Sequence, residues 1–150
     1  MSRVLVTLAA PDSPDEVEQQ FYEALRRAQI DVLMSLWAEE DDALCVHPGG
    51  PRMVGAAAIR ASFEAVFANR GGLPIHAEKI HRVHTATAAV HSVLEHLELS
   101  TPEGGTQSAW VMATNIYVPT PKGWRLVAHH ASPADLQDIN EEHSVPTVLH

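Results

Sequence analysis

Residues 21–37 read FYEALRRAQIDVLMSLW and contain two amphipathic helical patterns in succession. Upstream of them, Ser13 and Glu16 place a capping hydroxyl and an N3 carboxylate around a first-turn proline, which predicts where the first helix begins. Its apolar residues recur at helical spacing as far as Ala28, and Asp31 then begins a second, shorter helix. The chain is therefore expected to open with a pair of helices.

Strand patterns dominate the rest of the chain. A short apolar strand at 43–46 is followed by the turn sequence HPGGP, and a third helix extends from Gly55 to the NRGG sequence that closes it. Four segments rich in Val, Thr, Ile and Leu then follow, at 74–84, 87–100, 107–119 and 123–132. Helices followed by a meander of strands predict an α+β domain, in which the helices pack on one face of an antiparallel sheet.

The chain of 150 residues is expected to form a single domain over 1–135, followed by a polar, acidic tail over 136–150. Met1–Ala10 is apolar, but its hydrophobic run is too short for a signal peptide, and we expect a loose start or an edge segment there. No segment approaches the roughly 20 apolar residues that a membrane span requires.

The charge pattern argues against two classes of partner. The formal net charge is -9, and the ten Lys and Arg residues form no cluster. A nucleic-acid-binding protein needs a basic face, and a membrane-surface protein needs a basic amphipathic helix, so we expect neither partner. The single cysteine, Cys45, excludes an internal disulfide and fits a cytoplasmic location.

Three stretches carry a resemblance to a known family. They are the helix pair at 21–37, the sequence PRMVGAAAIR at 51–60 and the sequence GWRLVAHHAS at 123–132. Their order and spacing resemble the nuclear transport factor 2-like (NTF2-like) superfamily, and specifically its SnoaL-like branch. The resemblance implies a cone-shaped, strongly curved sheet wrapped around three N-terminal helices, with a largely apolar pocket between the two layers. It also implies a homodimer through the convex sheet face.

Ketosteroid isomerase, which has this fold, provides a residue-by-residue comparison. Its carboxylate base falls on His47, its oxyanion-hole Asp falls on Asn115, and its oxyanion-hole Tyr falls on Phe21, one residue before Tyr22. Histidine can still take a proton near neutral pH, and Asn can donate a hydrogen bond, but Phe can donate nothing. The resemblance therefore does not imply a ketosteroid isomerase reaction.

Strand alternation adds one more candidate, His130. In a regular last strand His130 shares a face with Leu126, which the resemblance makes the concave face. His47, Asn115 and His130 are therefore the predicted catalytic residues, able to line one pocket. The predicted ligand-binding residues are Phe21, Trp37, Arg52 and Leu126. Plainer roles remain open: each histidine could instead hold one structural hydrogen bond, and Arg52 could form a helix-entry salt bridge.

The ten histidines raise the question of a metal. Those expected on neighbouring strands are His76, His81, His84, His91 and His96, so cross-strand pairs are possible. No Cys-x-x-Cys or His-Glu-x-x-His motif is present, however, and a closed zinc site needs four convergent ligands. We therefore expect no metal and no cofactor, and we interpret Cys45 as a core thiol.

Three functions remain open from the sequence. The first is an acid–base enzyme of the isomerase, hydrolase or cyclase type that uses pocket histidines. The second is a non-catalytic domain that binds a small apolar molecule. The third is a dimeric interaction module, in which the convex sheet face joins two copies through residues such as Val111, Ala113 and Val127. The substrate is not identified by any motif.

Overall fold

The computed structural model describes residues 11–39 and 41–139. In chain order the elements are α1 (Pro14–Arg27), α2 (Ile30–Ser35), β1 (Leu44–Val46), β2 (Arg52–Val54), α3 (Ala56–Arg70), β3 (Ile75–His84), β4 (Ala89–Ser100), β5 (Thr106–Thr120), β6 (Gly123–Pro133) and α4 (Leu136–Ile139). The predicted α+β class is confirmed, whereas β2 and α4 were not predicted. The segment Met1–Ala10 and most of the expected tail lie outside the described residues.

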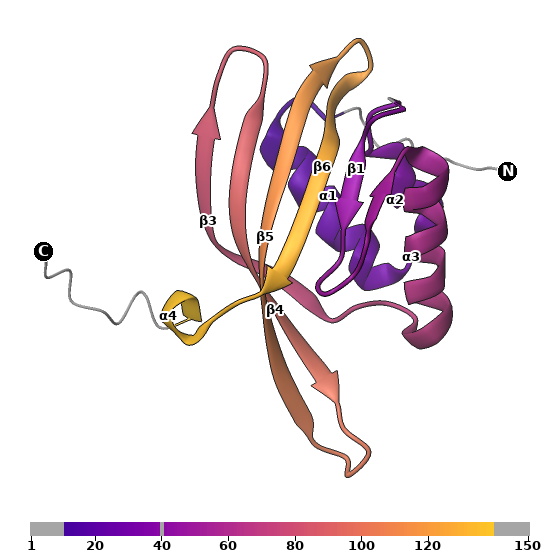
Figure 1. The fold of residues 1–150 in the computed structure, drawn as a ribbon, viewed down its shortest axis with the longest axis vertical. Helices are drawn as coiled ribbons and strands as arrows, with labels where there is room; N and C mark the ends of the chain where they lie inside the picture. Colours follow the sequence, from indigo (N-terminus) through magenta and orange to yellow (C-terminus); the bar gives the residue numbers. More distant parts are fainter. Residues whose placement is uncertain (1–10, 40, 140–150) are drawn as a thin grey trace, which may run out of the picture.

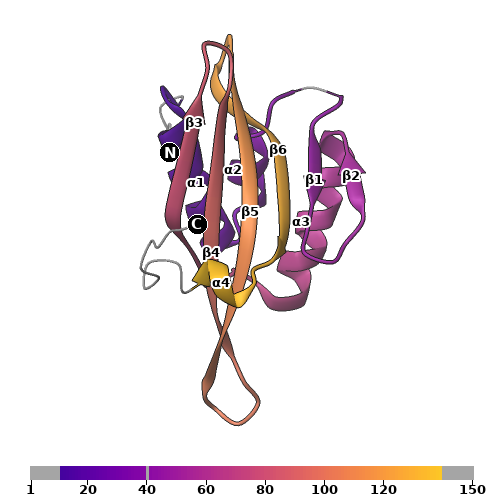
Figure 2. The ribbon, with the colours of Figure 1, turned by 60° about the vertical axis from the view of Figure 1, so that its left-hand side comes forward.

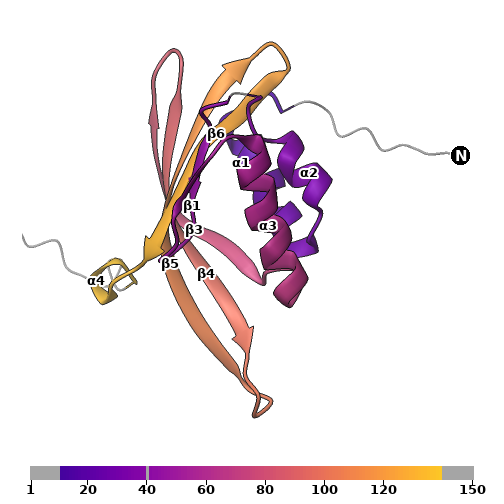
Figure 3. The same cartoon turned by 45° about the vertical axis from the view of Figure 1, so that its right-hand side comes forward.

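One curved sheet of six strands forms the frame of the molecule, in the order β2-β1-β6-β5-β4-β3 (Figure 2). All neighbours pair antiparallel except β1 and β6, which run parallel, so the expectation of a purely antiparallel sheet is wrong at that pair. Helices α1, α2 and α3 cover one face, and α4 lies on the other side (Figure 3). The far ends of β4 and β5 extend beyond the body as a two-stranded ribbon (Figure 1).

Helix α1 begins and ends where the local chemistry requires. The Ser13 hydroxyl accepts a hydrogen bond from the backbone N–H of Glu16, which confirms the predicted cap. At the other end, Gly72 passes directly over the last turn. A Cβ at Gly72 would lie 1.9 Å from the carbonyl oxygen of Arg26, so only glycine fits there. This close approach brings β3, which follows Gly72, alongside α1.

Two β-bulges decide which side chains face the helices. In β6, Val127 is an extra residue without a partner in β5. Ile116 pairs with Ala128 and the next residue, Tyr117, pairs with Leu126, so Val127 bulges out between them. In β3, the pairing register shifts by one residue between Glu78 and His81 in the same way. Beyond each bulge the alternation of side chains is reversed, so a regular pattern assigns the wrong face.

The core lies between the three helices and the inner face of the sheet. Its members include Val17, Leu33, Ile59, Val93 and Tyr117, all without exposed surface. None of the helices in the described part of the chain has the length and apolarity to span a membrane.

The outer face of the sheet differs from the one that we expected. Ala113 is fully buried on the inner face, which Val111 shares by alternation, and Val127 packs against the core. These three residues, which we offered as examples of an outer-face interface, therefore do not supply one, and the interface residues stay open. The outer face of β5 carries Trp110 instead, whose ring stacks on that of His96 with centroids 4.0 Å apart.

Candidate functional site

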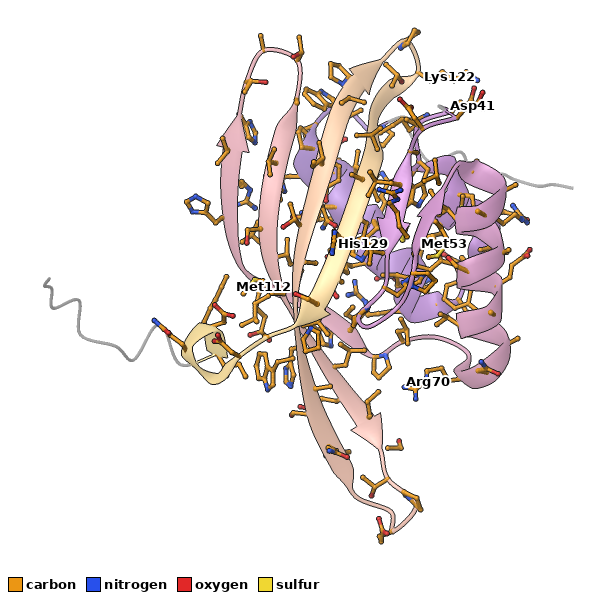
Figure 4. All side chains as sticks on the ribbon, viewed as in Figure 1. Asp41, Met53, Arg70, Met112, Lys122 and His129 are labelled. Carbon is orange, nitrogen blue, oxygen red and sulfur yellow. The ribbon has the colours of Figure 1, made fainter. Side chains whose placement is uncertain are left out.

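A single row of inner-face residues crosses all six strands. From β2 to β3, successive partners in the sheet are Met53, Cys45, His129, Asn115, His91 and Arg82. Figure 4 shows Met53 and His129 at the same level, with β1 between their strands. Three members of this row, His129, Asn115 and His91, are polar and buried. Buried polar groups need partners. Tyr22 and Glu18 of α1 supply them for Asn115 and His91, and Asn115 itself supplies one for His129.

The first set of partners is a chain of three hydrogen bonds, which we call the relay. The Nδ1 of His129 lies 2.5 Å from Oδ1 of Asn115, and the Nδ2 of Asn115 donates to the Tyr22 hydroxyl over 3.0 Å. The Tyr22 hydroxyl in turn donates to Oε2 of Glu95 over 2.7 Å. Because each amide or hydroxyl both accepts and donates, all three bonds point toward the Glu95 carboxyl.

Burial sets the protonation of both ends of the relay. Removal from water raises the pKa of Glu95 to about 7, and the nearby Glu18 adds to this, while the Tyr22 hydrogen bond works against it. The same burial lowers the pKa of His129 to about 3, so its imidazole is neutral. Burial and Glu95 raise the pKa of the Tyr22 phenol. At neutral pH the relay therefore ends on a carboxyl that can hold or release a proton.

A second cluster lies beside the relay and centres on Glu18. Its Oε2 accepts a hydrogen bond from the Tyr117 hydroxyl over 2.7 Å and lies 3.0 Å from Nδ1 of His91. Burial and Glu18 raise the pKa of Tyr117, which keeps that phenol a donor. The side chain of Asp15, one turn earlier on α1, lies at the edge of the cluster, 4.0 Å from Nε2 of His91.

A surface cleft between α1 and β3 reaches both clusters. It has a volume of about 280 Å³ and is lined by Asp15, Glu18, Gln19, Tyr22, Arg26, His76, Ala77, Ile80 and Arg82. Glu18 and Tyr22 connect the cleft to the buried groups. Ala77, directly opposite Glu95 in the sheet, brings the cleft near that carboxyl. Most of these side chains are polar, so the cleft suits a ligand with hydrogen-bonding atoms.

Of the predicted catalytic residues, Asn115 and His47 face inward. Asn115 is fully buried in the middle of the relay. His47 follows β1 and lies against α3, where its Nε2 is 3.0 Å from the Ser62 hydroxyl and its ring packs edge-on to Phe63. Burial lowers the pKa of His47, which favours the neutral imidazole. His47 does not line the cleft over Glu18 and Tyr22.

His130 and Arg52 lie away from the buried groups. The bulge at Val127 turns His129 inward and leaves His130 exposed, so the expectation that His130 shares an inner face with Leu126 is wrong. Arg52 is an exposed residue of β2, opposite Val46. His47 and His130 are therefore not brought together.

The predicted pocket-wall residues are packed in the core. Phe21 and Leu126 have no exposed surface, and the Phe21 ring makes edge contacts with Tyr22 and Trp37. Trp37 forms an isolated bridge to Leu126 and also borders a shallow cavity near Arg60. An apolar pocket at these residues stays a prediction.

Sequence reasoning missed Tyr22, Glu95, Glu18 and His129. The ketosteroid isomerase alignment placed a non-donating Phe21 where Tyr22, the next residue, reaches Asn115. One signal was available on α1, where polar residues recur at helical spacing beside the apolar stripe and end up lining the cleft. Another was Glu95, a charged residue within an apolar strand.

The chain is similar to known proteins both in sequence and in fold. The model of the SnoaL-like domain family matches residues 15–135. No curated protein sequence matches the chain. Among solved structures, a proposed calcium/calmodulin-dependent protein kinase type II association domain from Thiobacillus denitrificans is similar, with 30% identity, a TM-score of 0.76, and coverage of 84% of this chain and 98% of that one.

Two further structures share the arrangement. A proposed dehydratase of the NTF2-like family from Streptomyces avermitilis has 30% identity and a TM-score of 0.72, over 79% of this chain and 92% of that one. An uncharacterised protein with a cystatin-like fold from Caulobacter vibrioides has 17% identity and a TM-score of 0.70, over 85% and 92% of the two chains. The family model covers most of this chain, and the chain belongs to the SnoaL-like domain family of the NTF2-like superfamily.

Proposed function

We propose that this domain binds a small molecule in the cleft between α1 and β3 and exchanges a proton with it through Tyr22 and Glu95. The observation that carries the proposal is the relay, whose three hydrogen bonds all point to one buried carboxyl beneath the cleft. A hydrogen-bond network with a purely structural role requires only that each buried polar group has a partner. A carboxyl held near neutral pKa also has the protonation balance that general acid–base catalysis uses.

The other relay members support this role indirectly. Asn115 holds the Tyr22 hydroxyl in place, and neutral His129 fixes the orientation of the Asn115 amide. His47 lies apart from the relay against Ser62, and we assign it a supporting position rather than a direct role. The reaction class that fits is proton transfer to or from an oxygen or an activated carbon, as in isomerases and dehydratases.

A chromophoric phenol tests the proposal directly. The absorbance of 4-nitrophenol distinguishes its neutral and ionised forms, and the molecule titrates near neutral pH. We expect the full chain to bind it and to change its apparent titration. Tyr22→Phe and Glu95→Gln should each weaken binding by roughly tenfold, as expected for loss of a buried hydrogen bond to a charged partner.

The exposed loop variant Glu103→Gln serves as the matched control and should behave as the parent. Equal binding by the parent, Tyr22→Phe and Glu95→Gln would exclude the relay as the binding site. Absence of binding up to millimolar 4-nitrophenol would likewise count against a ligand-binding cleft.

Self-association is a second candidate function. It is favoured by the similarity, at 30% identity over nearly the whole of that chain, to a proposed kinase association domain. On this proposal two copies join through the outer sheet face, where Thr114 is exposed on the same face of β5 as Trp110, four residues further along the strand. Thr114→Arg would place a charge in that interface, whereas Gln107→Arg lies on the projecting ribbon and serves as the control.

Sedimentation at micromolar concentration distinguishes the outcomes. A dimer that becomes a monomer only in Thr114→Arg supports the proposal. A monomeric parent protein would exclude it.

A further inference from the structure

Three side chains outside the relay converge beside the cleft, which two of them, Asp15 and Glu18, line. Asp15 and Glu18 lie one turn apart on α1, and His91 lies on the inner face of β4. One potential ligand atom from each lies within 4.8 Å of the other two. We propose that Asp15, Glu18 and His91 bind a divalent first-row transition cation such as Zn²⁺. This proposal does not depend on proton exchange at Glu95.

The unpartnered nitrogen of His91 is the observation that points to a ligand. The imidazole is fully buried, and its Nδ1 lies 3.0 Å from Oε2 of Glu18. Oε2 of Glu18 already accepts from the Tyr117 hydroxyl, so Nδ1 is the donor in its contact with this oxygen and Nε2 is the ring nitrogen that can bind a cation. Among the described residues, this Nε2 is one of two buried polar side-chain atoms without a hydrogen-bond partner.

A carboxylate that accepts from one ring nitrogen is the arrangement that orients histidine ligands in metal sites. Glu18 makes that contact here and is itself fixed by the Tyr117 hydroxyl. Both bonds use Oε2 of Glu18, so its Oε1 takes part in neither. The ring of His91 is thus held with Nε2 directed toward Asp15, 4.0 Å away.

The spacing fits one cation after a small adjustment. Zinc lies about 2.0–2.2 Å from nitrogen and oxygen ligands, so donor atoms around it are about 3–4 Å apart. The Asp15 side chain is 51% exposed at the start of α1 and can rotate to shorten its distance to His91. The cleft that Asp15 and Glu18 line supplies the entry path and room for water ligands.

Arg82 competes with a cation for this site. Its Nε donates to Oδ1 of Asp15 over 2.9 Å, and its side chain is 43% exposed. The bulge in β3 is what places Arg82 opposite His91. A cation beside His91 competes with this guanidinium for Oδ1 of Asp15, so removal of Arg82 should increase cation affinity. A simple surface ion pair predicts no such effect.

Cobalt titration tests the proposal. The untagged full chain is treated with a chelator, dialysed and titrated with Co²⁺ while the visible absorption of the bound ion is followed. We expect one Co²⁺ per chain, displaced by Zn²⁺. Asp15→Asn should weaken binding roughly tenfold or more, and Arg82→Gln should strengthen it.

Two further variants make the result specific. Asp31→Asn, at an exposed carboxylate on α2, should bind Co²⁺ as the parent does. His91→Gln should abolish binding, and its folding is checked by circular dichroism because the residue is buried. If that variant does not fold, the surface variants Asp15→Asn and Arg82→Gln decide alone. No Co²⁺ binding at millimolar concentration, or binding that Asp15→Asn and Arg82→Gln leave unchanged, would overturn the proposal.

Discussion

Replacing Glu95 by Gln should change how folding stability depends on pH, because the buried carboxyl exchanges a proton when the chain folds. Its pKa is about 7 in the folded protein and near 4.5 when it is exposed. A carboxyl with a raised folded pKa adds stability below pH 4.5, and this stability is lost as pH rises to about 7. The difference of about 2.5 units between the folded and exposed pKa values corresponds to roughly 3–4 kcal/mol, at about 1.4 kcal/mol per unit.

His129 has the opposite dependence. Its pKa is about 3 in the folded protein and near 6.5 when exposed, so its contribution is complete above pH 6.5 and is lost as pH falls toward 3. Between about pH 4.5 and 6.5 folding takes one proton onto Glu95 and releases one from His129. The two slopes cancel, and these residues together leave the parent stability independent of pH there.

Urea unfolding of the parent and Glu95→Gln at pH 4.5, 5.5, 6.5 and 7.5 measures the effect. The stability of the variant relative to the parent should rise by about 1.4 kcal/mol per pH unit and then level off near pH 7. His129→Asn should show the reverse slope, and Glu103→Gln, in an exposed loop, should show none. A difference between parent and Glu95→Gln that does not change with pH would refute the reasoning.

Three further substitutions have definite expected outcomes. Trp37→Ala should lower the unfolding free energy by about 3–5 kcal/mol, because the ring is only 2% exposed in the core; an unchanged urea midpoint would contradict this. Tyr22→Phe should lower the unfolding free energy by about 1–3 kcal/mol and raise the pKa of Glu95 further, because the hydrogen bond that it removes favours the carboxylate. A carboxyl NMR titration measures this pKa, and a value below that of the parent would contradict the reasoning. Gly72→Ala should cost about 1–3 kcal/mol by pushing the chain off α1. In contrast, Gly105→Ala has ordinary space and is the control for that measurement.

The elements of the fold could be predicted because their signals are local. Capping at Ser13, the glycine-rich closure of α3 and the apolar strand patterns all act within a few residues. The arrangement of the helices on the sheet was then predicted from the resemblance of 21–37 and 123–132 to the NTF2-like superfamily.

The site could not be predicted to the same extent, for two physical reasons. Alternation along β6 assigned His130 to the inner face, but the bulge at Val127 depends on pairing with β5 and is not encoded in β6 alone. Polar residues such as Glu18 and Glu95 normally stay exposed. They are buried here only because Tyr117 and Tyr22, distant in sequence, meet them in the folded chain.

The extra residue at Val127 has a consequence for how such a domain can diverge. Loss of Val127 itself would remove the bulge but leave Ile116 opposite Ala128 and Tyr117 opposite Leu126, so His129 would still face the helices. Faces would be exchanged beyond this point only if the bulge closed while β6 kept its length, because the pairing would then slide by one residue and His130 would turn inward in place of His129. The length of β6 can therefore change by one residue at this position without moving the nitrogen that contacts Asn115.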